Sequence, residues 1–530
     1  MEKQEIRTHY SGAMLFAAKL MSVATGIIFT LMVLNSLSQP DYGAYGALVN
    51  TIIPYFTMFS GPISFWAMRF AARDKKGATK TGIVGNLAVS AIATLVYFAV
   101  LPLLTASPDL QKYVLIYLVA AAQIIELYLV TVLEACLQAK RPHFVGYGLL
   151  VGEILKVSFV YLFVARLQLA ALGAILTLIV AFAIKIAFYF EIIWKELKQK
   201  IALSYIKEWL KGSTFNLYNI AGDRLAALIF VMLLWYGTTT GYGYYYASVQ
   251  IANIITYSTF LAFALTPKLL SDANIDEATT SLKNVLLFAV PMTAGVVAIP
   301  SSFLLFAKET GDYIAAAPVL TILAIDALIS TISTIFTYVL YGVEKVDEKA
   351  EIPFRQVVKS RLFIAFSLPY VHSAITLPIA FYALTNLAGN DPVSVAMYVT
   401  AITLVGRAVS FVILYRVLRK DVKVKIPWKS IGKYVAAASV MGLIMFLGHP
   451  VGRITTLLFT GIGGLIYIAL LMAIDKETRT LARTVLQFVR IRLRLCAKSL
   501  RTRVRRLTRT LLQFIRIRLN HPRPQQENLN

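Results

Sequence analysis

Residues 241–249 read GYGYYYASV, and 200 residues earlier, residues 41–49 read DYGAYGALV. Each stretch opens a long apolar run. The two stretches agree without a gap at Tyr42/Tyr242, Gly43/Gly243, Tyr45/Tyr245, Ala47/Ala247 and Val49/Val249. The same element at two places in one chain predicts an internal duplication, with the second copy beginning near residue 213.

The composition sets the class of protein. Of the 530 residues, 58% are hydrophobic and only 15% are charged. A soluble protein of this length needs more charge to cover its surface. Apolar windows recur along the chain, and about 20 such residues cross about 30 Å of hydrocarbon. The sequence therefore predicts an all-α polytopic membrane protein. Cys136 and Cys496 form neither a metal-ligand spacing nor a disulfide framework, so we expect no metal and no cofactor.

We predict fourteen transmembrane helices, six in each half and two more at the C-terminal end. The predicted spans are residues 11–37, 43–67, 82–104, 113–137, 145–165, 169–189, 213–236, 241–267, 284–306, 313–342, 362–386, 393–417, 431–447 and 454–474. An even number of spans per half leaves both halves in the same orientation, so the duplication is expected to be a parallel repeat.

The basic residues predict the orientation. Alternate loops hold clusters of Lys and Arg, for example around residues 69–80, 195–211 and 345–361, whereas the loops between them hold scattered cations. Positively charged loops remain cytoplasmic. We therefore expect a plasma-membrane protein whose N- and C-termini are both cytoplasmic.

The same pattern predicts the domain organisation. It contains an N-terminal six-helix lobe, a cytoplasmic linker helix lying along the membrane surface, a C-terminal six-helix lobe, two additional helices and a basic cytoplasmic tail. The boundaries of these five parts are residues 1–189, 190–212, 213–420, 421–474 and 475–530.

Four blocks of sequence together resemble the polysaccharide transporter family of lipid-linked oligosaccharide flippases. They are LNSLSQPDYGAYGALV (34–49), GPISFWAMRFAAR (61–73), GEILKVSFV (152–160) and NIAGDRLAALIF (219–230) followed by the second tyrosine-rich stretch. The larger group also contains multidrug and toxic-compound extruders and lipid II flippases. The resemblance covers roughly residues 11–420. It implies two six-helix bundles meeting in a V, a central cavity, alternating access and a polyprenyl-linked saccharide as cargo.

Charged residues within the apolar spans are the candidate site, because an unpaired charge facing lipid costs several kcal/mol. A lysine- and arginine-lined cavity would neutralise the phosphate of a polyprenyl-linked saccharide. Tyrosine rings would stack on its sugars. The substrate-binding candidates are Lys19, Arg69, Lys156, Arg224, Arg407, Tyr42, Tyr45, Tyr242 and Tyr245.

The acidic residues within the spans are candidates for coupling transport to Na⁺ or H⁺. They are Glu126, Glu153, Asp223 and Asp326. Structural alternatives stay open for several members of both sets. Glu153 and Lys156 stand three residues apart on one helix and can pair with each other. A salt bridge between helices explains Asp223 as well as an ion site does. Snorkelling is the alternative for Arg69, Lys185 and Lys19.

The C-terminal tail is strongly basic. Residues 475–530 hold fifteen Lys or Arg and three Asp or Glu, and they repeat RTVLQFVRIRL (483–493) as RTLLQFIRIRL (509–519). The apolar positions follow a helical stripe. We expect residues 479–519 to bind anionic lipids as an amphipathic helix. No nucleic-acid fold or aromatic interleaving accompanies this charge, so nucleic acid is not an expected partner.

The function predicted on these grounds is a flippase that moves lipid-linked saccharides from the inner to the outer leaflet, and glycan-assembly enzymes are candidate partners. An ion-coupled exporter of drugs or other amphiphiles on the same fold is the alternative. A glycan polymerase or ligase is disfavoured, because such enzymes carry a large extracellular loop and the outer loops here are short. An assembly scaffold that recruits partners through the tail is the last alternative.

Overall fold

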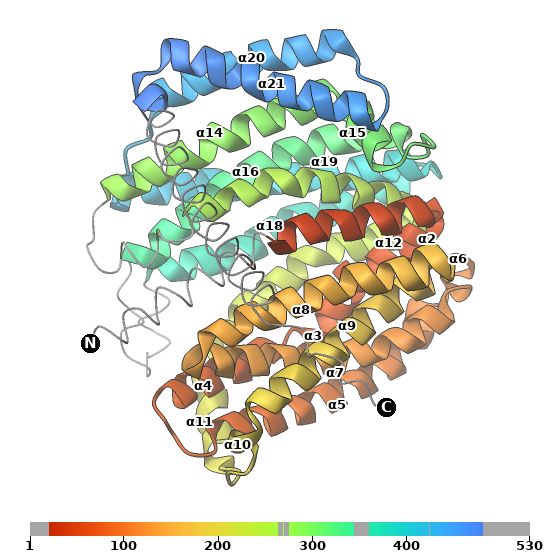
Figure 1. Cartoon of the computed structure of the whole chain (residues 1–530), viewed down its shortest axis with the longest axis vertical. Helices are drawn as coiled ribbons and strands as arrows, with labels where there is room; N and C mark the ends of the chain where they lie inside the picture. The colour runs from red at the N-terminus through yellow and green to blue at the C-terminus, as the bar shows by residue number, and fades with distance from the viewer. Residues whose placement is uncertain are drawn as a thin grey trace, which may run out of the picture. The chain divides into compact units, whose positions relative to one another are not determined.

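A computed structural model describes residues 18, 21–262, 265, 269, 275–343, 360–422 and 424–480. The chain divides into two compact units, residues 1–464 and 465–530. All helices from α2 to α20 belong to the first unit (Figure 1). Lys19, Cys496 and residues 481–519 of the predicted tail helix lie outside the described residues.

The first half of the chain forms a group of helices that contact one another. Its helix α7 packs against α4, α5, α8 and α9. The elements are the helix Met21–Ser36, α2 (Gln39–Ala47), η1 (Leu48–Ile52), α3 (Ile53–Thr57), α4 (Ser60–Ala72), α5 (Ala78–Leu104), α6 (Pro108–Gln111), α7 (Val114–Lys140), α8 (Pro142–Val160), η2 (Tyr161–Arg166) and α9 (Ala170–Ile192).

The second half forms another such group around α12, which packs against α16, α18 and α19. Helix α20 packs along α14 at its side. The elements are α12 (Thr214–Thr256), η3 (Tyr257–Ala262), α14 (Asp276–Ala298), α15 (Pro300–Ala307), η4 (Ile314–Ala316), α16 (Ala317–Val343), α18 (Arg361–Asn386), α19 (Pro392–Val417), η6 (Leu418–Val422), α20 (Trp428–Gly448) and α21 (Arg453–Ile474).

Among the described residues, eleven helices are long and apolar enough to cross a membrane. The difference of three helices from the predicted fourteen arises at four of the predicted spans. The first span appears as the shorter helix Met21–Ser36, and the second is broken by a π-helical turn, η1, ahead of Pro54. The seventh and eighth form one long element with a break at Thr238, where φ is 60°. The eleven helices are therefore consistent with fourteen spans.

The two halves meet along α2 and α12 through the duplicated motif. Gly43 lies against the backbone of Thr239 and Gly243, and Gly243 lies against the carbonyl of Gln39. A Cβ atom added at Gly43 would penetrate the Thr239 carbonyl oxygen. Glycine has no side chain at this point, so the two backbones can approach closely. The repeated YGxY sequence is thus the crossing point of the two halves.

Short capped turns lie at the same end of the bundle as this crossing. The Ser38 side chain accepts a hydrogen bond from the Asp41 N–H at the start of α2, and Ser107 accepts one from Leu110 at the start of α6. Each cap is followed by a proline in the first turn, which favours helix initiation. In Figure 1, α2 and α6 lie toward the right-hand end of the bundle, and α4, α10 (Trp194–Leu197) and α11 (Leu203–Gly212) lie toward the other end.

The linker between the halves holds the helix α11 (Leu203–Gly212). It packs against α4 and α5 of the first half. Its Trp209 side chain is fully buried and contacts Phe70 with ring centroids 5.5 Å apart. One face of the predicted surface helix is therefore covered by protein, while Leu203 and Leu210 on the other face are exposed.

Candidate functional site

Two adjoining cavities lie among the helices of the second half. The larger one has a volume of about 340 Å³ and is lined by residues of α12, α16, α18 and α19, including Asp223, His372 and Arg407. The smaller one has a volume of about 110 Å³ and includes Asp326 and Arg407 in its lining. Arg407 lines both cavities and is the charged residue that they share.

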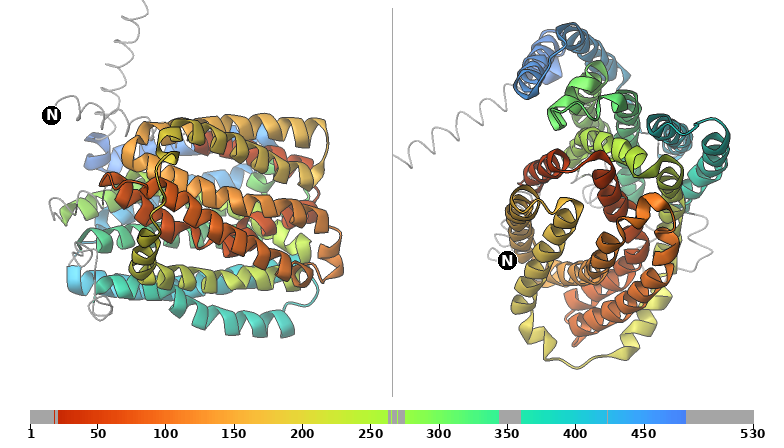
Figure 2. Two further views of the ribbon diagram at one scale, coloured as in Figure 1. Left: turned by 90° about the horizontal axis from the view of Figure 1, so that it is seen from below. Right: turned by 90° about the vertical axis from the view of Figure 1, so that its right-hand side faces the viewer.

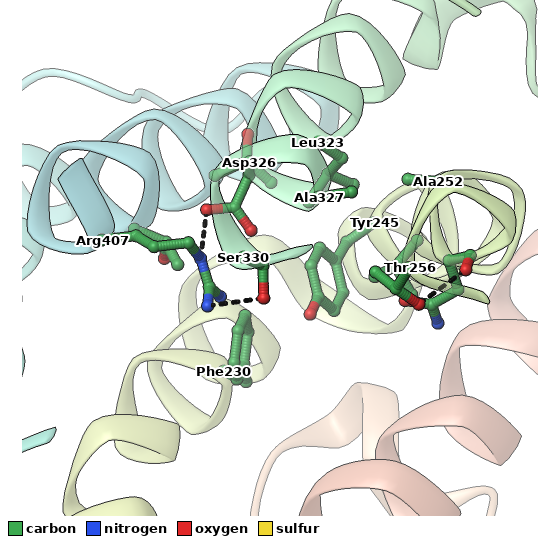
Figure 3. A pocket seen from close by; sticks show the side chains of 13 residues that line it. Phe230, Tyr245, Ala252, Thr256, Leu323, Asp326, Ala327, Ser330 and Arg407 are labelled. Atoms are coloured by element: carbon green, nitrogen blue, oxygen red, sulfur yellow. Dashed lines mark hydrogen bonds and ion pairs between the residues drawn. The ribbon is translucent and has the colours of Figure 1, made fainter. Parts of the chain in front are cut away.

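Arg407 reaches from α19 to two residues of α16 (Figure 3). Its Nε lies 2.5 Å from Asp326 Oδ1, and its Nη1 donates to Ser330 Oγ at 3.2 Å. The Asp326 side chain is 10% exposed and the Arg407 side chain is 34% exposed. The carboxylate is therefore neutralised inside the bundle, and the outer part of the guanidinium remains open to the cavities.

Aromatic rings from both sides of the α12 break line the smaller cavity. Phe230 and Tyr245 stack with centroids 4.9 Å apart, and both belong to the lining that also includes Arg407 (Figure 3). Asn253 and Thr256 add amide and hydroxyl groups to the same lining. A cation beside aromatic faces and hydroxyls is a combination that binds phosphate and sugar groups.

Arg224 lies where the halves meet. Its Cζ lies 5.8 Å from the centroid of the Tyr55 ring on α3, and the Tyr55 hydroxyl donates to the Arg224 carbonyl at 2.8 Å. The Arg224 Nε is buried and has no hydrogen-bond partner among the described residues. This guanidinium therefore keeps a donor free for a further acceptor.

Glu153 and Lys156 form an ion pair on α8, with 2.7 Å between Lys156 Nζ and Glu153 Oε1. The same carboxylate accepts from Ser22 Oγ at 2.9 Å and from Thr25 Oγ1 at 2.8 Å. The pair thus ties α8 to the helix Met21–Ser36. Lys156 therefore pairs with an acidic residue of its own helix, which is the alternative that the three-residue spacing left open.

Lys185 on α9 does not snorkel. It is 5% exposed, and its Nζ lies 2.6 Å from Oε1 of Glu134 on α7. The Tyr189 hydroxyl donates to the same oxygen at 3.0 Å. The prediction of snorkelling was wrong because it treated the lysine on its own helix and overlooked an acidic residue on a neighbouring one.

The other charged candidates differ in their surroundings. Arg69 lies over rings of its own helix, 4.7 Å from the Phe65 centroid and 5.6 Å from that of Trp66. Asp223 is exposed and lines the larger cavity. Glu126 is 9% exposed, and its Oε2 has no hydrogen-bond partner in the described part of the chain. Lys19 lies outside the described residues.

Three of the four candidate tyrosines lie in the packed core rather than on a cavity wall. Tyr42, Tyr45 and Tyr242 are at most 3% exposed. The Tyr242 hydroxyl forms a hydrogen bond of 2.6 Å with Thr51 Oγ1, and the Tyr42 ring lies 5.0 Å from that of Tyr246. Tyr245 alone of the four lines a cavity among those described. The other three hold the crossing of α2 and α12 together.

Polar contacts join the halves at the end where this crossing lies. Lys308 is 6% exposed, and its Nζ donates to the Leu37 carbonyl at 2.7 Å while lying 3.0 Å from Asp312. Gln39 donates to the Asp312 carbonyl, and Asn35 donates to the Ala307 carbonyl at 2.9 Å. We call the following residues the latch: Asn35, Leu37, Gln39, Asp109, Thr239, Ala307, Lys308 and Asp312.

Asp109 completes the latch through the break in α12. The Thr239 N–H follows the non-helical Thr238 and donates to Asp109 Oδ2 at 2.7 Å. Lys112 lies 3.2 Å from the same carboxylate. Burial raises the pKa of the Asp109 carboxyl, but hydrogen bonds from Thr239 and Lys112 outweigh burial, so its pKa lies below the ordinary value of 3.8. Asp109 is therefore ionised at neutral pH.

The sequence interpretation missed several of these residues. Glu134, Tyr55 and Ser330 contact charged candidates, and Lys308 lies in one of the loops whose cations the sequence analysis described only as scattered. An acidic residue inside an apolar run was available as a signal for Glu134. Tyr55 and Ser330 carry no such signal, because residues of these types are common in transmembrane helices.

No family model matches the sequence, and a comparison with curated proteins finds no match. Solved structures do match. The lipid II flippase MurJ in an inward closed conformation aligns with a TM-score of 0.66 and 14% identity, over 87% of this chain and 99% of that chain. The similarity therefore spans nearly the whole MurJ chain.

Multidrug transporters align over a smaller part. An inward-facing MATE family transporter of the MOP superfamily has a TM-score of 0.54 and 12% identity, over 76% of this chain and 97% of that chain. The MATE multidrug transporter DinF-BH has a TM-score of 0.54 and 15% identity, over 78% of this chain and 96% of that chain. The chain thus has the all-α, multi-pass membrane fold of MurJ and the MATE transporters.

Proposed function

We propose that the chain is a flippase that moves polyprenyl-linked oligosaccharides or polysaccharide precursors from the inner to the outer leaflet by alternating access. The observation that supports this most strongly is the unpaired donor of Arg224 at the junction of the halves. A buried guanidinium donor without a partner is costly unless a ligand supplies an acceptor. The phosphate that links a saccharide to its lipid carries such acceptors.

Arg407 and the aromatic rings of the smaller cavity provide the second contact. The outward part of the Arg407 guanidinium and the stacked Phe230 and Tyr245 rings suit a phosphate followed by sugars. The fold supports the same cargo class, since the match to MurJ covers 87% of this chain whereas the match to the inward-facing MATE transporter covers 76%.

Alternating access requires that the halves separate at one end while they meet at the other. The latch joins them at the end opposite the basic loops 69–80 and 195–211. If those loops are cytoplasmic, as their charge predicts, the latch forms the extracellular gate, and its contacts hold the two halves together there. Release of the latch would open the cargo path to the outer leaflet.

The decisive experiment deletes the gene in its native cell and follows surface glycan together with lipid-linked saccharide in the cytoplasmic leaflet. Loss of surface glycan with accumulation of the lipid-linked saccharide supports a role at the flipping step. Complementation with Arg224→Gln should fail at normal protein abundance. Arg166→Gln is the matched control, because Arg166 is exposed and contacts Tyr161 of its own segment. Restoration of glycan by Arg224→Gln would contradict the proposal.

Export of cationic amphiphiles is the second candidate, favoured by the larger cavity. Asp223 is an exposed carboxylate there, beside apolar residues such as Phe230 and Leu368. A carboxylate in an apolar cavity suits an organic cation. Increased drug accumulation in the deletion strain, without any change in glycan, would favour this function over the first.

A further inference from the structure

The four acidic candidates inside the bundle differ in whether a cation neutralises them. Glu153 is paired with Lys156, and Asp326 is paired with Arg407. Asp223 is exposed to a cavity. Glu126 is buried, and the described residues provide neither an ion pair nor a hydrogen bond to its Oε2.

A second unpartnered group lies on the same face of α7. Gln123 is 2% exposed, and its Nε2 has no hydrogen-bond partner among the described residues. Residues three apart on a helix have Cβ atoms about 5–6 Å apart, so the amide and the carboxyl are neighbours. Two buried polar side chains without partners, one an acid and one a hydrogen-bond donor, stand together inside the first half.

The helices packed against α7 present charged groups, but those that form contacts inside the bundle use other partners. Arg69 lies over its own aromatic rings, Lys156 pairs with Glu153, and Lys185 pairs with Glu134. Within the described ranges, no acidic, basic or histidine residue of α4, α5, α8 or α9 forms an ion pair with Glu126. These residues are Arg69 on α4, Lys80 on α5, His143, Glu153 and Lys156 on α8, and Lys185 and Glu191 on α9.

A carboxylate buried without a counter-charge costs far more than a neutral acid, so such a group holds a proton instead. We propose that Glu126 is a proton-binding site that couples transport to the proton gradient, with Gln123 as the donor that stabilises the carboxylate once water reaches it. This proposal rests on the proposed transport function. Glu126 is protonated in the conformation described here and releases its proton in the conformation that hydrates α7.

Infrared difference spectroscopy on the purified full-length protein in lipid tests the site without any cargo. The wild type should show a protonated carboxyl band at neutral pH that titrates away at high pH and is unchanged when Na⁺ replaces K⁺. Glu126→Gln, which mimics the neutral acid in shape, should lack that band. Glu191→Gln, at an exposed position on α9, should retain it. Absence of the band in wild type, or its persistence in Glu126→Gln, would overturn the proposal.

Transport in proteoliposomes tests the coupling separately. With one proton per substrate, each unit of pH gradient should shift the leaflet ratio of a fluorescent lipid-linked saccharide about tenfold. Glu126→Gln should lose this response while still equilibrating the substrate, and Glu126→Asp should retain it. A wild-type response to a Na⁺ gradient but not to pH refutes the coupling. Failure of wild type to move the saccharide at all bears on the proposed function, and the infrared titration still decides the site.

Discussion

Arg407 is the residue on which the second-half site depends, because it neutralises Asp326 and faces both cavities. Its ion pair crosses from α19 to α16, so it serves packing and binding together. A single substitution therefore has two effects, and they can be separated by removing both charges of the pair.

We expect Arg407→Gln to lower the free energy of unfolding by about 3–5 kcal/mol, since it leaves a buried carboxylate unpaired. The double variant Arg407→Gln/Asp326→Asn removes both charges and should regain most of that stability. Both variants should fail to transport the saccharide, because both lack the Arg407 guanidinium. Thermal unfolding in detergent and the proteoliposome assay provide the two readouts. Restoration of transport in the double variant would show that Arg407 acts through packing alone.

The latch contains a titratable residue outside the spans, Asp109. Its pKa is depressed in the folded protein, so its contribution to stability is present above the ordinary value of 3.8 and is lost as pH falls through the lower folded pKa. Asp109→Asn should therefore be less stable than wild type at neutral pH, and the difference should shrink as pH falls below 3.8. Thermal unfolding from pH 3 to 7 measures this, and a difference that grows in acid would reverse the assigned sign.

At the scale of elements, the crossing of α2 and α12 is the decisive contact between the halves. Gly43 and Gly243 allow the backbones to meet, and the tyrosines around them fill the space on either side. The contact lies beside the latch, so a side chain added here should hold the two elements apart at that end.

We expect Gly43→Ala to prevent closure, because its Cβ would penetrate the Thr239 carbonyl. Gly26→Ala is the matched control: it lies on a helix of the same half with no neighbouring atom within 4 Å of an added Cβ. Alkylation of Leu37→Cys in a variant without the native cysteines reports the opening, since Leu37 is 1% exposed in the closed state. Gly43→Ala should accelerate labelling at least tenfold and Gly26→Ala should not. Equal rates would mean that the crossing does not control the gate.

At the scale of the whole molecule, the fold matches that of MurJ over 87% of this chain, whereas the predicted tail helix lies almost entirely outside the described residues. The two views in Figure 2 show the helices of both halves running along a roughly common direction. The lobe boundaries and the inside position of both termini remain predictions.

The basic tail has its own test. A peptide of residues 479–519 should bind vesicles that contain anionic lipid and lose that binding in high salt, because its attraction to the surface is largely electrostatic. A peptide of the same composition with the apolar spacing scrambled is the control, and it should bind more weakly. Binding that is insensitive to salt, or absent at low salt, would exclude the membrane-surface role.

Hydrophobicity and periodicity act locally along the chain, so the sequence by itself determined the helical membrane class, the positions of most spans and the relation between the two YGxY stretches. It also placed Arg224, Arg407 and Glu126 inside spans. The breaks at η1 and Thr238 could not be predicted from the sequence, because a π-helical turn and a positive φ depend on what packs against the helix.

Only the tertiary structure decided which charge meets which. Lys185 pairs with Glu134 although they are 51 residues apart, and Arg407 pairs with Asp326 across 81 residues. In the tertiary structure, Tyr42 and Tyr242 are buried at the crossing of α2 and α12. Glu126 forms no ion pair with any of the described residues. The physical reason is that the state of a charge in a membrane depends on its neighbours in space, and helices distant in sequence supply those neighbours.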